Sequence, residues 1–166
     1  MNYECEICGQ RHEYYFGIKA GVSQTLSQIK KENSKRVFKP EKDYFLVDKS
    51  IAVFPAIIEL KTNYDKPFWY ETWVECDGNA FINMSENYIN EIGSDIKGKL
   101  YDNLIPYYEN TKGLNCTIKF SSNMRDSDRA QIHILDDSKL KSDQMNGLTN
   151  ERLIELMNKI HHKNED

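Results

Sequence analysis

Residues 51–60 read IAVFPAIIEL and carry apolar side chains at both odd and even positions. Because alternate residues of a strand face opposite sides of a sheet, this pattern predicts a central strand that is covered on both faces. Further strands are predicted on either side of it in the chain, at residues 43–47 and 68–76. The links at 48–50 and 63–67 carry turn-forming residues, and links this short favour antiparallel pairing, since a parallel pair needs a longer crossover.

The second half of the chain adds two more strands and the clearest helix. Residues 115–121 and 130–135 predict a hairpin whose connection at 122–129 is long and polar. Thr149 can cap a final helix, which the apolar spacing of three and four residues supports. The apolar residues of that spacing are Leu153, Ile154, Leu156, Met157 and Ile160.

Three further helical segments are predicted from weaker signals. One lies near Val22–Lys31, and a short one covers 96–105. A third should follow Asn83, because Glu86 three residues later resembles a capping arrangement. The apolar residues of this third helix, and the glycine expected to end it, are Tyr88, Ile89, Ile92 and Gly93.

The expected fold is therefore α+β, with a mainly antiparallel sheet. We found no internal repeat or flexible linker, so residues 1–166 are expected to form a single domain. Its first part, residues 3–16, predicts a knuckle-like hairpin, and the C-terminal amphipathic helix should pack on the sheet.

Composition points to a globular protein of the cytoplasm. Of the 166 residues, 39% are hydrophobic and 29% are charged, a mixture that can build one core. The first residues lack the basic start and apolar run of a secretory signal, and no stretch is long and apolar enough for a membrane helix. The four cysteines are accordingly expected to be thiols or metal ligands rather than disulfides.

The most specific local motif is Cys5-x2-Cys8-Gly9-x2-His12. Two residues between cysteines allow both sulfurs to reach one tetrahedral ion, and glycine tolerates the positive φ of such a turn. His12 is close enough on the returning strand to join them. Zinc is the metal that this set favours, but a structural site needs a fourth ligand, and a metal-free thiol pair is the alternative.

Strand periodicity narrows the choice of a fourth ligand. Cys76 and Cys116 alternate with polar neighbours on strands and share their faces with apolar residues, so both are expected in the core. His133 is expected at a partly exposed position. His161 and His162 remain as candidates, provided that the last helix packs beside the hairpin.

A site with three protein ligands suggests a different function. Water in the fourth position of a zinc ion can become a nucleophile near neutral pH, with Glu13 as a conceivable base, so a metal-dependent hydrolase is one alternative. Redox chemistry by Cys5 and Cys8 is less favoured, because the turn leads into a strand rather than a helix.

A second candidate site lies on the predicted strand at 68–76. Period-two alternation places Trp69, Glu71, Trp73 and Glu75 on one side. Two tryptophans among acids can form a recognition surface for a basic protein partner. The alternative is that this face packs under another part of the chain.

The charge of the chain is uneven. The net charge is −4, which disfavours attraction to nucleic acid, yet the segment Lys30–Lys42 is strongly basic. Such runs usually serve solubility, and nucleic-acid binding through this segment is kept as an alternative.

The order of these motifs resembles the bacterial domain-of-unknown-function 2199 family. The residues that carry the resemblance are Cys5-Glu6-Ile7-Cys8-Gly9-Gln10-Arg11-His12, Asp43-Tyr44-Phe45-Leu46-Val47-Asp48, Ile57-Ile58-Glu59-Leu60, Trp73-Val74, Ser85-Glu86-Asn87 and the closing helix from Leu148. The resemblance implies a bacterial cytosolic protein and implies no reaction.

These observations favour a noncatalytic protein-binding domain, and leave open whether zinc stabilises it or the cysteine turn is metal-free. An immunity or antitoxin-like role, in which the domain binds a bacterial toxin, is a further alternative that rests on analogy. The protein partner and the oligomeric state are not predicted by the sequence.

Overall fold

The computed structural model describes residues 2–39, 44–87, 95–104, 107–120 and 130–162, and two long strands form its centre. β6 (Ile51–Leu60) and β7 (Phe68–Asp77) pair antiparallel over their full lengths, which confirms the predicted central strand and its neighbour. Along β7 buried and half-buried residues alternate. Every second side chain therefore faces the core.

Three further strands close this pair into a five-stranded barrel. β8 (Ile96–Leu100), β9 (Asn115–Lys119) and β10 (Ala130–Ile134) follow β7 in antiparallel pairs, and β10 then pairs with β6 in parallel. Five successive antiparallel strands leave the first and the last pointing the same way, so the closing pair must be parallel. The α+β class is confirmed, and the mainly antiparallel sheet is corrected to a closed barrel with short added strands.

Both long strands change partners along one edge. On β6, β5 (Phe45–Val47) pairs with Ile51–Val53 and β10 pairs with Ala56 and Ile57, while β4 (Val37–Phe38) extends from β5. Pro55 lies between these two contacts, where its missing N–H costs least. On β7, the short strand β3 (Gly17–Ile18) covers one part of the edge and β8 covers another.

The first and last predicted helices are confirmed. α1 (Gln24–Glu32) is capped by Ser23, whose hydroxyl accepts a hydrogen bond from Leu26 N, and a 3₁₀ turn (Ser34–Arg36) follows it. α4 (Asn150–His161) is capped by Thr149 as predicted. The buried residues of α4 belong to the same apolar cluster as the barrel interior, and they include Leu153, Leu156 and Met157.

Two helix predictions need correction. α2 (Gly78–Asn87) begins before Asn83, because Asp77 accepts a hydrogen bond from Ala80 N at its start. Asn83 and Glu86 therefore lie within the helix rather than at its start. The predicted residues Tyr88, Ile89, Ile92 and Gly93 lie outside the described residues.

The segment 96–105, predicted as helical, begins instead with strand β8. Gly98 sits so close to β7 and β9 that a Cβ would lie 2.5 Å from both the Glu75 carbonyl oxygen and Ile118 Cδ1. Glycine thus marks a close packing contact in a strand rather than a helix. Helix α3 (Lys139–Asn146), with Ser138 as its cap, was not predicted.

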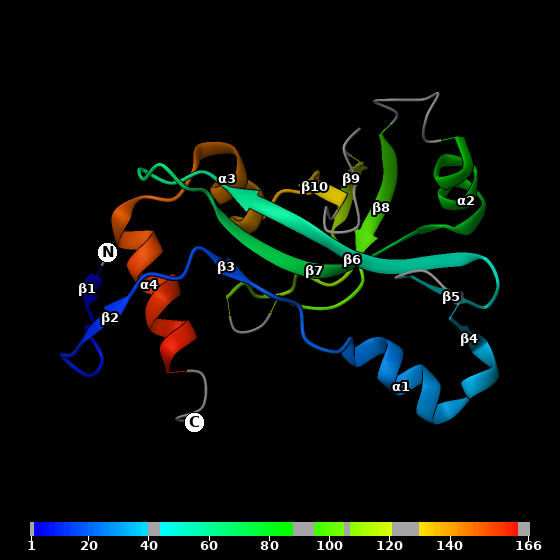
Figure 1. Cartoon of the computed structure of the whole chain (residues 1–166), viewed down its shortest axis with the longest axis horizontal. Helices are drawn as coiled ribbons and strands as arrows, with labels where there is room; N and C mark the ends of the chain where they lie inside the picture. The colour runs from blue at the N-terminus through cyan, green and yellow to red at the C-terminus, as the bar shows by residue number, and fades with distance from the viewer. Residues whose placement is uncertain (1, 40–43, 88–94, 105–106, 121–129, 163–166) are drawn as a thin grey trace.

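The N-terminal hairpin and the C-terminal helix lie together at one end of the molecule (Figure 1). β1 (Asn2–Glu4) and β2 (Arg11–Glu13) form a separate two-stranded sheet that lies beside α4, whereas α1, β4 and α2 lie toward the opposite end (Figure 1). None of the helices in the described residues has the length and apolar character needed to cross a bilayer. This arrangement brings the cysteine turn next to the C-terminal histidines.

Candidate metal centre

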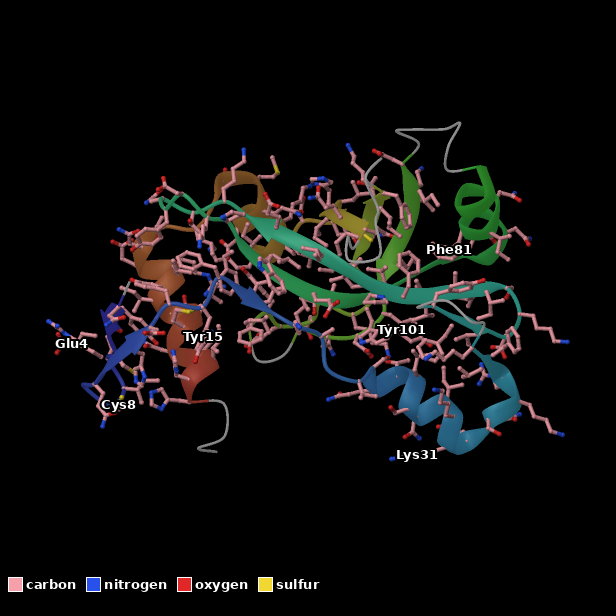
Figure 2. All side chains as sticks on the ribbon, viewed as in Figure 1. Glu4, Cys8, Tyr15, Lys31, Phe81 and Tyr101 are labelled. Carbon is pink, nitrogen blue, oxygen red and sulfur yellow. The ribbon has the colours of Figure 1, made fainter. Side chains whose placement is uncertain are left out.

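The turn between β1 and β2 fixes the two cysteines. Cys5 N donates to Gln10 O and Gly9 N donates to Cys5 O, both at 2.8 Å, and Gly9 has a φ of +68°. A glycine adopts this left-handed conformation without the steric cost that other residues meet. Cys5 is only 1% exposed, whereas Cys8 lies at the exposed tip of the hairpin (Figure 2).

Helix α4 brings a histidine to this turn. His162 Nε2 lies 3.1 Å from Cys5 Sγ, and His12 Nε2 lies 3.2 Å from Cys8 Sγ. One ligand atom from each of these four residues lies within 4.8 Å of all the others. We call this group the Cys/His cluster.

The spacing of the Cys/His cluster is close to that of a tetrahedral site. With Zn–S bonds of about 2.3 Å and Zn–N bonds of about 2.0 Å, ligand atoms at tetrahedral angles lie roughly 3.3–3.8 Å apart. The two Cys–His distances are slightly shorter and the largest separation is longer. Small side-chain rotations would bring all four donors to a common distance from one ion, so the cluster can hold a metal.

The structure distinguishes the two C-terminal histidines. His161 is not a member of the Cys/His cluster: its ring stacks on His12 with centroids 4.3 Å apart, and its Nε2 lies 3.3 Å from Glu13 O. It therefore contacts a cluster member instead of contributing a ligand atom. On a helix, consecutive residues point about 100° apart, and the sequence alone does not fix that rotation.

The other cysteines lie where periodicity placed them. Cys76 and Cys116 are buried in the barrel, and burial raises the pKa of each thiol to about 12. His133 is exposed on β10. These residues are unavailable to the Cys/His cluster, as the sequence predicted.

Protonation in the cluster suits metal binding. Burial disfavours the Cys5 thiolate, but hydrogen bonds from the backbone of Cys8 and Ile7 and from His162 outweigh burial and lower the pKa of the Cys5 thiol to about 7. Burial lowers the pKa of His12, with repulsion from His161 and His162 adding to the effect. Thiolate and neutral imidazole are the forms that bind metal ions.

A buried tyrosine, Tyr3, packs against the cluster, and the sequence analysis did not predict this contact. Tyr3 is buried, and its ring centroid lies 5.9 Å from those of both His12 and His161 and 5.1 Å from that of Tyr14. Tyr3 pairs with His12 across the hairpin. Alternation could have revealed it, because Tyr3 and Cys5 are two residues apart and both are buried.

The predicted recognition surface on β7 is partly covered by the protein's own chain. Its four residues are half-buried, and the segment from Gly17 to Gly21 contacts the first three of them. Ala20 N donates to Glu71 Oε2, and Trp73 Nε1 donates to Gly21 O at 2.9 Å. Trp69 lies against Gly17 so closely that a Cβ there would be 1.8 Å from its ring.

Glu75, the fourth residue of that surface, pairs with Lys99 on β8. Burial raises the pKa of its carboxyl, and Lys99 and Lys112 oppose the rise. Partner binding by these four residues stays a prediction.

The described part of the basic segment, residues 30–39, covers the end of α1 and strand β4. Lys30 and Lys39 lie 4.5 and 5.8 Å from the ring centroid of Phe45, and Arg36 pairs with Asp48. Nucleic-acid binding by this segment also stays a prediction.

Comparisons with known proteins identify a family but no activity. We found no match among curated proteins or among solved structures. One family profile matches residues 4–148, a range that contains Cys5, Cys8 and His12 and ends before His162. The chain therefore belongs to the DUF2199 family, described as uncharacterized protein conserved in bacteria.

Proposed function

We propose that this protein is a noncatalytic binding domain whose N-terminal hairpin and C-terminal helix are held together by zinc. The observation that carries this proposal is the Cys/His cluster, in which donors from the two ends of the chain lie within 4.8 Å of one another. Two sulfurs and two nitrogens are a common ligand set of structural zinc. Zinc bound here would link β1, β2 and α4.

The number of donors supports a structural role over a catalytic one. A hydrolytic zinc site keeps one coordination position open for water. The Cys/His cluster offers four protein ligands to a metal that prefers four. The hydrolase alternative, which assumed three ligands, is therefore less favoured.

Exposed apolar residues on the same hairpin support the binding part of the proposal. Ile7, between the two cysteines, is 60% exposed, and Tyr15, just after β2, is 51% exposed. A hairpin fixed by zinc would present both side chains in a defined position, which lowers the entropic cost of binding a protein partner. Figure 2 shows Tyr15 beside α4.

Zinc content tests the metal part. Tag-free protein, purified without chelators, should contain about one zinc ion per chain by elemental analysis. His12→Ala should lose this zinc. His133→Ala is the matched control, because His133 is exposed on β10 and is not a member of the cluster. Wild-type protein that neither contains zinc nor takes it up in titration would exclude the proposed site.

Partner capture tests the binding part. Ile7→Ser and Tyr15→Ser should keep their zinc and lose proteins that the wild type captures from extract of its native cells. Met145→Ser is the control, because Met145 on α3 is apolar and 70% exposed, yet lies outside the hairpin. Equal capture by all three variants would remove Ile7 and Tyr15 from the binding surface.

A further inference from the structure

A cavity of about 180 Å³ lies at the edge of β7, away from the Cys/His cluster. β3 pairs with Trp69 and Tyr70, and β8 pairs with Val74 to Cys76, so the edge of β7 between them has no strand partner among the described residues. Residues 18–22 form one wall of the cavity and residues 102–104 form another. The break between two strand partners thus leaves room for a ligand.

Two buried polar atoms on residues that line this cavity lack hydrogen-bond partners within the described part of the chain. One is the hydroxyl of Tyr70, which is 1% exposed and lies on the core face of β7, opposite Glu71 and Trp73. Asp102 Oδ2 is also buried and unpartnered, although Asp102 Oδ1 accepts a hydrogen bond from Thr25 N at 3.0 Å. A buried carboxylate oxygen without a donor is costly, and a ligand with N–H groups would supply the donor.

The charged residues that line the cavity favour a positively charged ligand. Asp102 and Glu71 both contribute carboxylates, and Lys19, the basic residue in the described lining, has an exposed side chain. Glu71 is fixed by its hydrogen bond from Ala20 N. The carboxylates are therefore held in place by the backbone and attract a cation.

Aromatic residues complete the lining. Trp73 and Tyr107 line the cavity together with Tyr70, and the bond from Trp73 Nε1 to Gly21 O holds the indole in position. Aromatic faces attract alkylammonium and guanidinium groups through their ring quadrupoles. Carboxylates beside aromatic rings favour an organic cation over a metal ion, which prefers a shell of oxygen ligands.

We propose that this cavity binds a small organic cation with N–H groups, either an alkylammonium or a guanidinium group. The cation donates to Asp102 Oδ2 and lies against Trp73. A cavity of this volume holds the space of about six water molecules at roughly 30 Å³ each, enough for such a group with a short alkyl chain. The cation can be a free molecule or a lysine or arginine side chain of a protein ligand. This proposal is independent of zinc.

Titration of the full chain with methylguanidinium, and with methylurea as its neutral analogue, tests the proposal. In NMR spectra, the Trp73 indole N–H and the Gly21 amide should shift saturably with methylguanidinium and little with methylurea. Asp102→Asn should weaken methylguanidinium binding by about tenfold, since a charge-assisted hydrogen bond is lost. Glu59→Gln, at an exposed carboxylate on β6, should leave the affinity unchanged.

Glu71→Gln removes only the charge of the second carboxylate in the lining and should also weaken binding, which provides a second variant if Asp102→Asn disturbs the start of α1. A Gly-Arg-Gly peptide that binds more tightly than methylguanidinium would assign the cation to a protein side chain. Tighter binding of methylguanidinium would assign it to a free molecule. No saturable shift, equal binding of methylurea, or wild-type affinity in folded Asp102→Asn would each overturn the proposal.

Discussion

The barrel and the hairpin–α4 junction are stabilised by different kinds of interaction. In the barrel, β6 and β7 are ten residues long and several side chains, such as Ile58 and Leu60, are completely buried. In the hairpin, β1 and β2 have three residues each, and Tyr3 and Cys5 are its buried apolar residues. The barrel is held by many buried apolar side chains, whereas the described part of the hairpin adds two fully buried residues, Tyr3 and Cys5, to the same apolar cluster.

The difference shows how one chain can combine two sources of stability. Short two-stranded hairpins are marginal in water, so the hairpin needs an additional constraint. α4 participates in both regions, because Leu156 and Met157 belong to the apolar cluster of the barrel and His162 follows at the Cys/His cluster. Zinc at the cluster would stabilise the junction without changing the barrel.

The largest effect is expected from a cavity in the barrel. Ile58→Ala should lower the free energy of unfolding by about 4 kcal/mol, because it removes buried methyl groups and leaves a space that packed neighbours fill poorly. Chemical denaturation with and without a chelator measures this loss. The loss should be the same in both conditions, since Ile58 lies in the barrel.

Ile7→Ala is the matched control for this change. Ile7 is largely exposed, so the same truncation should alter the free energy of unfolding by less than about 0.5 kcal/mol. A loss at Ile58 that appears only when zinc is present would contradict the separation of the two regions.

A smaller effect is expected at the junction, where the two adjacent histidines can be compared. Free zinc at about a hundredfold above its dissociation constant should raise the free energy of unfolding of the wild type by about 2.7 kcal/mol. His162→Ala should lose most of this gain, because it removes a ligand of the Cys/His cluster. Chemical denaturation of the wild type, His162→Ala and His161→Ala, each with zinc and with chelator, measures this gain.

His161→Ala should keep most of the zinc-dependent gain, since His161 stacks on His12 and lies outside the cluster. The reverse result, with zinc dependence lost in His161→Ala and kept in His162→Ala, would assign the fourth ligand to His161.

The sequence predicted the parts of this comparison that depend on local pattern. Alternation along β7 placed Cys76 in the core, and the Cys-x2-Cys-Gly turn located half of the cluster. The choice between His161 and His162 depended on the rotation of α4, which packing determines. Closure of the barrel could not be predicted from local pattern either, because the pairing of β10 with β6 joins residues more than seventy positions apart.

The sequence did not reveal the roles of two residues in the segment 96–105, Gly98 and Asp102. The segment 96–105 was predicted as helical, yet the missing side chain of Gly98 is what allows strand β8 to approach Glu75 and Ile118. Asp102, in a segment predicted as helical, lies at the cavity through contacts with the start of α1. No spacing in the sequence links Asp102 to Tyr70 or Thr25. Only the fold brings these residues together.

The smallest expected effect is on the pH dependence of the free energy of unfolding. The thiols of the hairpin and of the barrel should change it in opposite directions. In the metal-free protein, the pKa of Cys5 is lowered from 9.0 to about 7. A lowered pKa in the folded state means that Cys5 contributes stability above pH 9 and loses it as the pH falls through 7. With chelator and reductant present, the free energy of unfolding should therefore rise between pH 7 and 9, and Cys5→Ser should remove this rise.

The barrel thiols should act in the opposite direction at higher pH. The pKa values of Cys76 and Cys116 are raised from 9.0 to about 12 by burial, so these thiols favour the folded state below pH 9 and lose that contribution as the pH approaches 12. Denaturation of wild type and Cys5→Ser at pH 7, 8, 9 and 10 separates the two contributions. If Cys5→Ser keeps the full rise between pH 7 and 9, another group is responsible, and Cys5 does not carry the thiolate that the junction needs to bind zinc.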